Sequence, residues 1–237
     1  MPVNAITLDA AGTLIFPREP VAKTYARIAR QHGGYLDASK VYPAFSHALN
    51  TMPPMACPRQ DQHRLGDWEF GWWRTLVRSV VDECGEVLAF DAFFEALYSY
   101  YAQPNEWALF AEVISTIDSM RARGLRIGVL SNFDSRLAPI LSHLGVTQRV
   151  DSVVYSTEAG AAKPDPAIFE LACQRLEVTA QEVLHIGDNR TADYAGARAA
   201  GLQALWLSRN VETPLNRPHE HTIESLDAAL IWLEKRK

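Results

Sequence analysis

Lysine and cysteine are both scarce in this chain, and each scarcity excludes a class of protein. Only five of the 237 residues are lysines, and the arginines are scattered rather than gathered in a stripe or tail. With a formal net charge of -5, this pattern argues against general binding to nucleic acid or to anionic membranes. The three cysteines, Cys57, Cys84 and Cys173, have no CxxC spacing, so neither a disulfide framework nor a structural zinc site is expected.

Long apolar runs are also missing. No stretch is long enough to span a bilayer, and the N-terminus leads into a strand-like segment without a charged-then-apolar leader. No internal repeat or low-complexity segment interrupts the chain. We therefore expect a cytoplasmic protein, a monomer or homodimer, with neither nucleic acid nor membrane as a partner.

Most of the chain alternates between helical and strand-like segments. Helices are predicted at 110–123, 137–144, 167–176 and 192–200, and strands at 126–130, 152–155, 183–186 and 204–207. A further apolar strand is predicted at 6–8. Such alternation predicts an α/β fold, a Rossmann-like parallel sheet with helices on both faces.

The segment after the first strand has a different character. It is rich in aromatics at helical spacing and predicts four helices, the first opened by Pro20 and the second capped by Ser39. The break at 103–105 looks like a hinge. The simplest architecture is a discontinuous α/β core, residues 1–17 and 105–237, with an all-helical cap domain at 18–104.

Polar side chains follow the predicted strands in order along the chain. The set comprises Asp9, Ser131 with Asn132, Lys163, Asp188 after Gly187, and Asp193. Each one alone is an ordinary turn or cap residue. Because ligands of an open parallel sheet gather outside the carboxyl ends of its strands, the whole set together predicts a functional site.

The chemistry of this set is consistent with phosphoryl transfer. Three converging carboxylates repel one another unless a cation lies among them, and oxygen ligands of this kind suit Mg²⁺. A hydroxyl from Ser131, the ammonium of Lys163 and nearby backbone N–H groups can hold a phosphoryl group. Asp9 can then attack phosphorus as a covalent nucleophile.

With these residues in place, the chain resembles the haloacid dehalogenase superfamily over nearly its whole length. The matching signatures are Asp9-Ala10-Ala11-Gly12-Thr13, Ser131, Lys163, and Gly187-Asp188 with Asp193. The helical insert is similar to that superfamily's first type of cap. Within the superfamily, the segment from Pro20 to Gly33 and the pair Trp72-Trp73 look most like the branch around rhythmically-expressed-gene-2 proteins.

The resemblance implies a hydrolase of small phosphorylated metabolites with Mg²⁺ as cofactor. Asp9 would become an aspartyl-phosphate. The implied metal ligands are Asp9, the backbone carbonyl of Ala11, Asp188 and Asp193. The implied phosphoryl-binding residues are Thr13, Ser131, Asn132 and Lys163, and Thr13 would also help to order the first loop.

Ala11 departs from the pattern of the phosphatases that the chain resembles. Those enzymes usually carry a second Asp two residues after the nucleophile, which protonates the leaving oxygen and later activates water. An alanine keeps the carbonyl but not the proton, and general acid–base catalysis typically contributes about 10²–10⁴-fold. The deficit is smaller for leaving groups of low pKa, such as aryl or acyl phosphates.

Three interpretations of Ala11 are open. The first is a phosphatase that is slow, selective for good leaving groups, or supplied with an acid by cap or substrate. The second is another reaction on the same fold: a haloacid dehalogenase, which has no need of the acid, or a phosphonoacetaldehyde hydrolase, which would need a cap lysine, here Lys23 or Lys40. The third is a phosphate-binding scaffold with impaired catalysis.

Overall fold

A six-stranded parallel sheet forms the centre of the molecule. The computed structural model describes residues 2–209 and 221–235. The strands lie in the order β10-β9-β8-β1-β6-β7, and every neighbouring pair is parallel. Their bounds are β1 Ala5–Leu8, β6 Arg126–Ser131, β7 Ser152–Tyr155, β8 Val183–Gly187, β9 Gln203–Leu207 and β10 Thr222–Ile223. The expected Rossmann-like α/β fold is confirmed, and β1 is central, paired with β6 on one side and β8 on the other.

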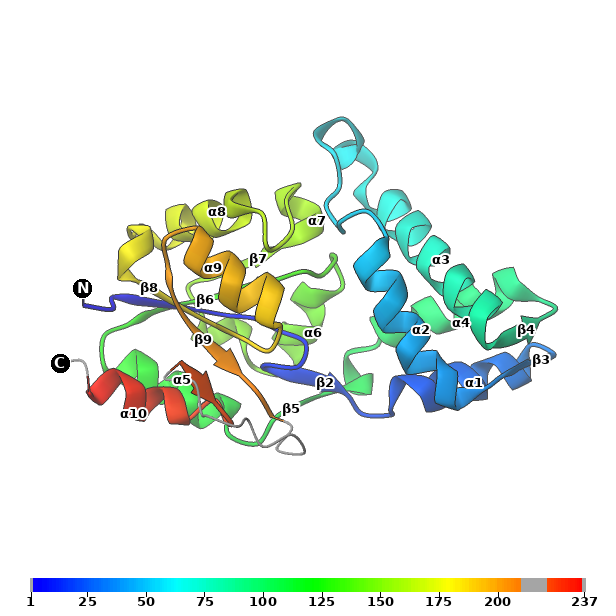
Figure 1. Ribbon diagram of the computed structural model, residues 1–237, viewed down its shortest axis with the longest axis horizontal. Coiled ribbons are helices and arrows are strands. Elements are labelled where there is room, and N and C mark those ends of the chain that lie inside the picture. Colours follow the sequence, from blue (N-terminus) through cyan, green and yellow to red (C-terminus); the bar gives the residue numbers. More distant parts are fainter. Residues whose placement is uncertain (1, 210–220, 236–237) are drawn as a thin grey trace.

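Helices cover both faces of this sheet (Figure 1). They are α5 Val113–Ala122, α6 Leu137–His143, α7 Ser156–Ala159, α8 Pro166–Leu176, α9 Gly196–Ala199 and α10 Ala228–Glu234. Alternate residues of β1 serve the two faces, because successive side chains of a strand point in opposite directions. Ile6 and Leu8 join the apolar cluster that includes residues of α5, α6 and α10, while Ala5 joins the cluster with α8 and α9.

Short helical turns complete the connections. They are the 3-10 turns η1 Arg59–Arg64, η2 Pro104–Glu106, η3 Thr147–Arg149 and η4 Ala180–Glu182, and the π-helical turn η5 Arg190–Ala195. The π-helical turn runs directly into α9, so the predicted helix 192–200 is two shorter pieces. Asp193 lies in the π-helical turn, and wider turns of this kind are frequent at functional sites.

Four helices form a separate unit beside the sheet, which we call the cap (Figure 1). Their bounds are α1 Val21–Gln31, α2 Ala38–Thr51, α3 Leu65–Cys84 and α4 Phe90–Ala102. A small antiparallel pair, β3 Gly34–Leu36 with β4 Gly85–Val87, joins them at one end. The cap has an apolar cluster of its own, drawn from residues between Tyr25 and Leu97.

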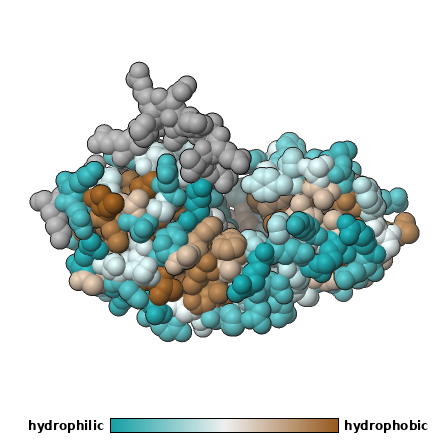
Figure 2. All heavy atoms as spheres, turned by 90° about the horizontal axis from the view of Figure 1, so that it is seen from below, coloured by the Kyte–Doolittle hydropathy of each residue, from teal (hydrophilic) through white to brown (hydrophobic). Residues whose placement is uncertain are grey.

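Two chain connections join cap and core through a second antiparallel pair. Strand β2, Ile15–Pro17, pairs with β5, Trp107–Leu109. Phe110 extends this pairing by donating its N–H to the carbonyl of Leu14 (3.1 Å), and a turn follows, so α5 begins at Val113 rather than at the predicted residue 110. In Figure 2 the two parts appear as adjoining lobes with hydrophilic residues over much of the visible face. The residue limits 1–17, 18–104 and 105–237 stay predictions.

Capping residues explain where two helices begin. Asp165 accepts a hydrogen bond from the N–H of Ala167 (2.9 Å), and Pro166 occupies the first position of α8. For α2 the predicted cap was wrong by two residues. Asp37 is the cap and accepts from the N–H and hydroxyl of Ser39, because an ionised carboxylate is the stronger acceptor.

The remaining expectations from composition concern cysteine and membranes. All three cysteines are buried and unpaired, so the expectation of no disulfide is confirmed. Among the helices of the described residues, none has the length and apolar character needed to cross a membrane.

Candidate active site

Asp9 lies at the carboxyl end of β1, in the middle of the sheet. The residue is 6% exposed, and one carboxylate oxygen, Oδ1, accepts hydrogen bonds from the hydroxyl of Ser131 (2.9 Å) and the ammonium of Lys163 (2.7 Å). Burial and the nearby Asp193 raise the pKa of Asp9, and Lys163 and Ser131 counteract that rise. The three predicted residues Asp9, Ser131 and Lys163, far apart in sequence, are therefore in direct contact.

Lys163 joins two carboxylates at the bottom of the site. Its ammonium donates to Asp9 (2.7 Å), to Asp193 Oδ1 (2.5 Å) and to the carbonyl of Leu130 (2.8 Å). Burial alone would lower the pKa of Lys163, but the charges of Asp193 and Asp9 outweigh burial and raise it. The lysine is thus a fixed positive charge at the strand ends.

Asn132 holds the backbone that carries Lys163. Its side-chain oxygen accepts from the N–H of Lys163 (2.7 Å), and its amide donates to the carbonyl of the same residue (2.8 Å). Asn132 also lines the cleft described below. The structure therefore gives Asn132 a positioning contact that the sequence did not predict, and its direct contact with a phosphoryl group stays a prediction.

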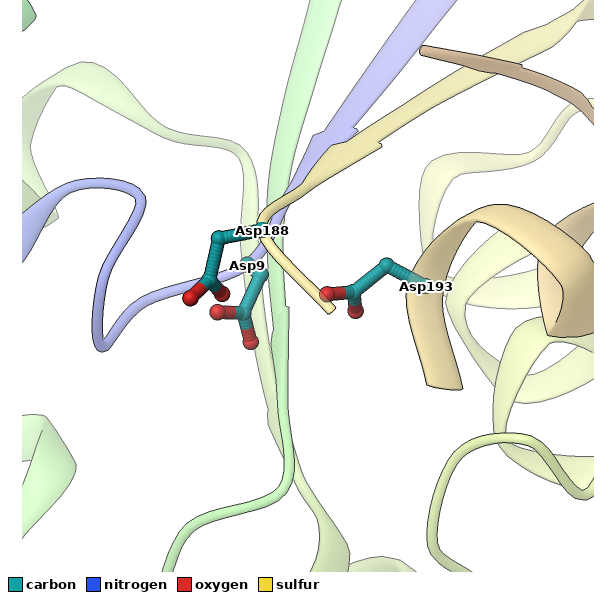
Figure 3. Close-up of side chains that lie close together, drawn as sticks. All are labelled: Asp9, Asp188 and Asp193. Atoms are coloured by element: carbon teal, nitrogen blue, oxygen red, sulfur yellow. The ribbon is translucent and has the colours of Figure 1, made fainter. Parts of the chain in front are cut away.

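Asp188 and Asp193 complete an acidic cluster with Asp9. Each of the three offers an oxygen, and these oxygens lie within 4.8 Å of one another. Figure 3 shows the carboxylates of Asp9 and Asp188 side by side, with Asp193 approaching from the opposite direction. Desolvation and then repulsion by Asp9 and Asp193 raise the pKa of Asp188 to about 7, although the residue is open to the cleft.

Asp193 has the opposite electrostatic environment. Burial would raise the pKa of Asp193, but the charge of Lys163 and the bonds from Lys163 and His185 lower it below its usual value. Its second oxygen accepts from the N–H of Asn189 (2.8 Å). One ammonium against three carboxylates leaves the cluster with excess negative charge, which a bound cation would neutralise.

Two glycines make room for these carboxylates. A side chain at Gly12, whose φ is +88°, would collide with the carboxylate of Asp188. At Gly187 a side chain would collide with Asp193. Hard oxygen donors in a space kept clear of side chains fit a divalent cation such as Mg²⁺.

Thr13 lies behind the cleft rather than on its surface. It is fully buried and outside the cleft lining, and its hydroxyl finds no hydrogen-bond partner among the described residues. Its carbonyl, however, accepts from Arg209 Nη2 (2.7 Å). The structure thus supports a part for Thr13 in ordering the loop after β1, and gives no support to the expected phosphoryl contact.

His185 lies behind Asp193 within β8. The ring is fully buried, and Nε2 is 3.2 Å from Asp193 Oδ1 while Nδ1 is 2.9 Å from the hydroxyl of Thr7. Burial lowers the pKa of His185, so the ring is neutral, with Nε2–H donating to Asp193 and Nδ1 accepting from Thr7. His185 is therefore a buried residue with satisfied partners that also fixes the orientation of Asp193.

Arg209 is a residue of this site that sequence reasoning missed. Its guanidinium donates to the carbonyls of Gly12 (3.1 Å) and Thr13, pairs with Glu112 (2.7 Å) and lies 3.6 Å from the ring centre of Phe110. The loop that carries Asp9 is therefore tied to the end of β9. Arg209 comes two residues after that strand, so the strand-end rule extended to β9 could have found it.

A cleft of about 550 Å³ separates these strand ends from the cap. Its core wall includes Asp9, Ala11, Lys163 and Asp188. Its cap wall comes from α2, from the segment 52–55 and from Trp72, whose indole N–H donates to the carbonyl of Pro53 (3.0 Å). Any reaction at Asp9 would thus occur under the cap.

The cap also binds the core through buried polar contacts. Glu69 of α3 is 1% exposed and accepts from the N–H of Ser135 (3.0 Å), from the Ser135 hydroxyl (2.5 Å) and from the Thr157 hydroxyl (2.5 Å). Trp73 donates its indole N–H to Asp134 (2.5 Å). We call the contacts of Glu69 and Trp73 the clasp, and they hold the segment that begins just after Ser131 and Asn132.

Comparison with known proteins agrees with this arrangement. Residues 3–201 match the family model described as haloacid dehalogenase-like hydrolase, so the chain belongs to this family of hydrolases. The haloacid dehalogenase-like hydrolase domain-containing protein 3 of Danio rerio is 36% identical over 231 residues, with 96% of this chain and 95% of the relative covered. The Rhythmically expressed gene 2 protein of Drosophila melanogaster is 28% identical over 254 residues, with 96% of each chain covered. The predicted family and branch are both confirmed.

Solved structures share the fold. A HAD phosphatase from Thermococcus onnurineus superposes with a TM-score of 0.66 at 22% identity, covering 98% of each chain. A dehalogenase crystallised with an intermediate complex gives a TM-score of 0.72 at 18% identity, covering 97% of this chain and 96% of that one. At these identities the likeness shows the fold, and the choice between phosphoryl and halide chemistry depends on this chain's own residues.

Proposed function

We propose that this protein is a Mg²⁺-dependent phosphatase that hydrolyses a small phosphorylated substrate through an aspartyl-phosphate on Asp9. One observation carries the proposal. The buried Asp9 carboxylate contacts a hydroxyl and an ammonium, and two further carboxylates lie close to it. The hydroxyl and ammonium suit phosphoryl oxygens, and the carboxylates suit a divalent cation.

The reaction would take two displacements at phosphorus. In the first, a carboxylate oxygen of Asp9 bonds to phosphorus while the bond to the leaving oxygen breaks and its electron pair departs with that oxygen. Ser131 and Lys163, which hold Asp9 Oδ1, would donate to the phosphoryl oxygens as these enter. In the second, water attacks phosphorus while the bond from phosphorus to Asp9 breaks and its electron pair returns to the carboxylate. The proton that the water loses passes to solvent or to the inorganic phosphate that is released.

The metal would be held by Asp9, Asp188, Asp193 and the backbone carbonyl of Ala11. Bound Mg²⁺ would neutralise the excess negative charge that the three carboxylates and an incoming phosphoryl group share. Gly12 and Gly187 support this assignment, since larger residues there would push Asp188 and Asp193 out of place.

The residues around the cleft favour phosphoryl chemistry over the two alternative reactions. Displacement of halide needs no cation, yet three carboxylates converge here, and no arginine is found among the described residues of the cleft wall. A phosphonoacetaldehyde hydrolase needs a cap lysine at the site, whereas Lys23 and Lys40 are exposed and lie outside that wall. A scaffold without catalysis would form no covalent phosphoryl adduct on Asp9.

The decisive experiment traps the covalent intermediate. Wild type is mixed with an aryl phosphate and Mg²⁺, quenched in acid and analysed by mass spectrometry. We expect a phosphoryl adduct that maps to Asp9, with turnover that stops on chelation of the metal. Asp9→Asn should lose both adduct and turnover. Asp118→Asn, which alters an exposed ion pair between α5 and Arg149, should keep both.

The trapping experiment has clear contrary outcomes. A folded wild type that gives neither adduct nor turnover would overturn the phosphatase proposal and favour the scaffold interpretation. Turnover in Asp9→Asn equal to that of wild type would place the nucleophile elsewhere.

A further inference from the structure

Helix α2 presents two apolar faces. Val41, Ala44 and Ala48 are buried in the cap cluster. On another face, Tyr42 and Leu49 are 67% and 42% exposed, and both line the cleft. Large apolar side chains left open on a helix that already has a buried face indicate a binding surface rather than core packing.

The spacing of this second face follows the helix. Tyr42, Ser46, Leu49 and Asn50 stand at i, i+4, i+7 and i+8, and all four line the cleft. Met52 and the buried Trp72 extend the same wall. The surface opposite Asp9 is therefore largely apolar and aromatic, with the hydroxyls of Tyr42 and Ser46 and the amide of Asn50 as polar groups.

Charge is confined to the other wall. Among the described cleft residues, the only charged side-chain types are Asp9, Lys163, Asp188 and Asp193, and all four belong to the core. Within the same described set, the cap wall has no cation to pair with a second anionic group on a substrate and no carboxylate to pair with an ammonium group. A charged leaving group would lose its hydration there without compensation.

A carboxylic acid is missing from the described cap wall as well. The wall contributes neither carboxylate nor histidine, its aromatic hydroxyl is the weakly acidic phenol of Tyr42, and Ala11 on the core side has no proton to give. A leaving oxygen then departs largely as its own anion, which an acidic phenol or enol does readily and an alkyl alcohol does not. The missing carboxylic acid and the apolar, uncharged cap wall thus both favour substrates whose leaving group is acidic and uncharged.

We infer that the substrates are phosphate monoesters of uncharged aromatic or enolic alcohols, whose apolar body packs on the Tyr42–Leu49 face of α2. This inference rests on the proposed phosphatase function and names its substrate class. Leu49 is the residue through which the cap selects the leaving group. Ser46 and Asn50 bind polar substituents on the substrate's apolar body.

A matched pair of substrates tests the inference. The 4-carbamoylphenyl and 4-carboxyphenyl phosphates have phenols of comparable acidity and differ in the charge that faces the cap. Wild type should show kcat/KM at least about tenfold higher for the carbamoyl ester, the effect of roughly one unfavourable contact. Calorimetric binding of both esters to the non-hydrolysing Asp9→Asn variant should give the same order of affinity.

A charge placed on the cap wall should reverse the preference. Leu49→Lys should lower kcat/KM for the carbamoyl ester about tenfold and raise it for the carboxylate ester. The matched control is Leu88→Lys, at an equally apolar residue that is 79% exposed, follows β4 and lies outside the cleft wall. It should behave as wild type.

The contrary outcomes separate the substrate class from the phosphatase function. Equal or better hydrolysis of the carboxylate ester by wild type, or identical effects of Leu49→Lys and Leu88→Lys, would overturn the cap inference while leaving the phosphatase in place. No hydrolysis of either ester, with no phosphoryl adduct on Asp9, would overturn the proposed function and this inference with it.

Discussion

Ala11 is exposed to the cleft and lacks the acidic group of a general acid. The residue is exposed and lines the cleft together with Asp9, so a longer side chain there would extend into space rather than into the core. Its neighbour Gly12 has no such freedom, because a side chain at that position would strike Asp188. The loop after β1 can therefore accept an acid at residue 11 without repacking.

Restoring the acid should change which esters are cleaved. Ala11→Asp should raise kcat/KM, which reports the first displacement, by about 10²-fold or more for an alkyl phosphate and much less for an aryl phosphate, because only the alkyl leaving oxygen needs the proton. Steady-state rates on 4-nitrophenyl and ethyl phosphate measure the contrast. Ala11→Asn, equal in size but without an acidic proton, is the control, and an equal gain in that variant would count against proton transfer.

Among single residues, the sequence predicted those that directly follow strands. It missed the roles that depend on contacts between residues far apart in the chain. Asp9, Ser131, Lys163, Asp188 and Asp193 could be found because carboxyl ends of parallel strands share one edge. The positioning contact of Asn132 and the burial of Thr13 depend on side-chain geometry that no spacing encodes. Likewise, nothing near Glu69 in sequence indicates Ser135 or Thr157 as its partners.

At the scale of elements, the loop after β1 is held by the start of α5. Glu112 precedes that helix, pairs with Arg209 and accepts from the N–H of Leu226 (3.3 Å), while Arg209 holds the carbonyls of Gly12 and Thr13. Burial would raise the pKa of Glu112, but hydrogen bonds from the backbone and from Arg209 lower it below its usual value. The folded state therefore favours the ionised carboxylate.

This preference predicts a pH-dependent contribution to stability. Because the folded pKa of Glu112 is lowered, the contribution is present above the unfolded pKa and is lost as pH falls through the folded one. Solvent screens this partly exposed group, so Glu112→Gln should lower the free energy of unfolding by about 0.5–1 kcal/mol near neutrality. The loss should shrink as pH falls below about 4.3, the ordinary pKa of a glutamate, and urea unfolding of both proteins at neutral and at acid pH measures it.

The control for that experiment is a surface pair. Glu158 forms a more exposed ion pair with Arg175 (3.3 Å), and Glu158→Gln should change stability little at either pH. A Glu112→Gln effect of the same size at both pH values would show that lost packing, rather than the charge, is responsible.

Among the elements, the sequence predicted most strands of the central sheet and missed the short pairs that join distant segments. Strand 152–155 and the helix over 167–176 follow from local signals and are confirmed. The pairs β2 with β5 and β3 with β4 have three residues per strand and join segments far apart in the chain, so no local pattern marks them. Helix α10 and strand β10 were not predicted at all.

At the scale of the whole molecule, the clasp decides how firmly the cap covers the cleft. Glu69 is a buried carboxylate whose hydrogen bonds all come from the core side, so breaking its contacts costs more than breaking a surface pair. Two of the contacted residues, Asp134 and Ser135, lie just after Ser131 and Asn132, and this links the position of the cap to the loop proposed to bind the phosphoryl group.

Weakening the clasp should open the cap. Glu69→Gln removes the negative charge that strengthens these buried hydrogen bonds, which should cost about 1–3 kcal/mol and speed hydrogen exchange in α3 and in residues 133–136. Small-angle scattering should report a larger radius of gyration. Glu95→Gln, at an exposed residue of α4, is the control, and unchanged exchange in Glu69→Gln would mean that other contacts hold the cap closed.

The architecture of core and insert could be expected because the two segments differ in hydrophobic period. The order of strands could not, since it depends on which crossovers pack best rather than on any one segment. The position of β1 between β6 and β8 is the clearest case.

That central position has a consequence for how the chain emerges during synthesis. The neighbours of β1 are residues 126–131 and 183–187, and the whole cap cluster, through Leu97, is translated before either of them. The cap core is thus complete at a stage when the strand leading to Asp9 still has both edges unpaired. An apolar strand with open edges is a target for chaperones and for misassembly, so the nascent chain is most vulnerable beside the residues that later line its cleft.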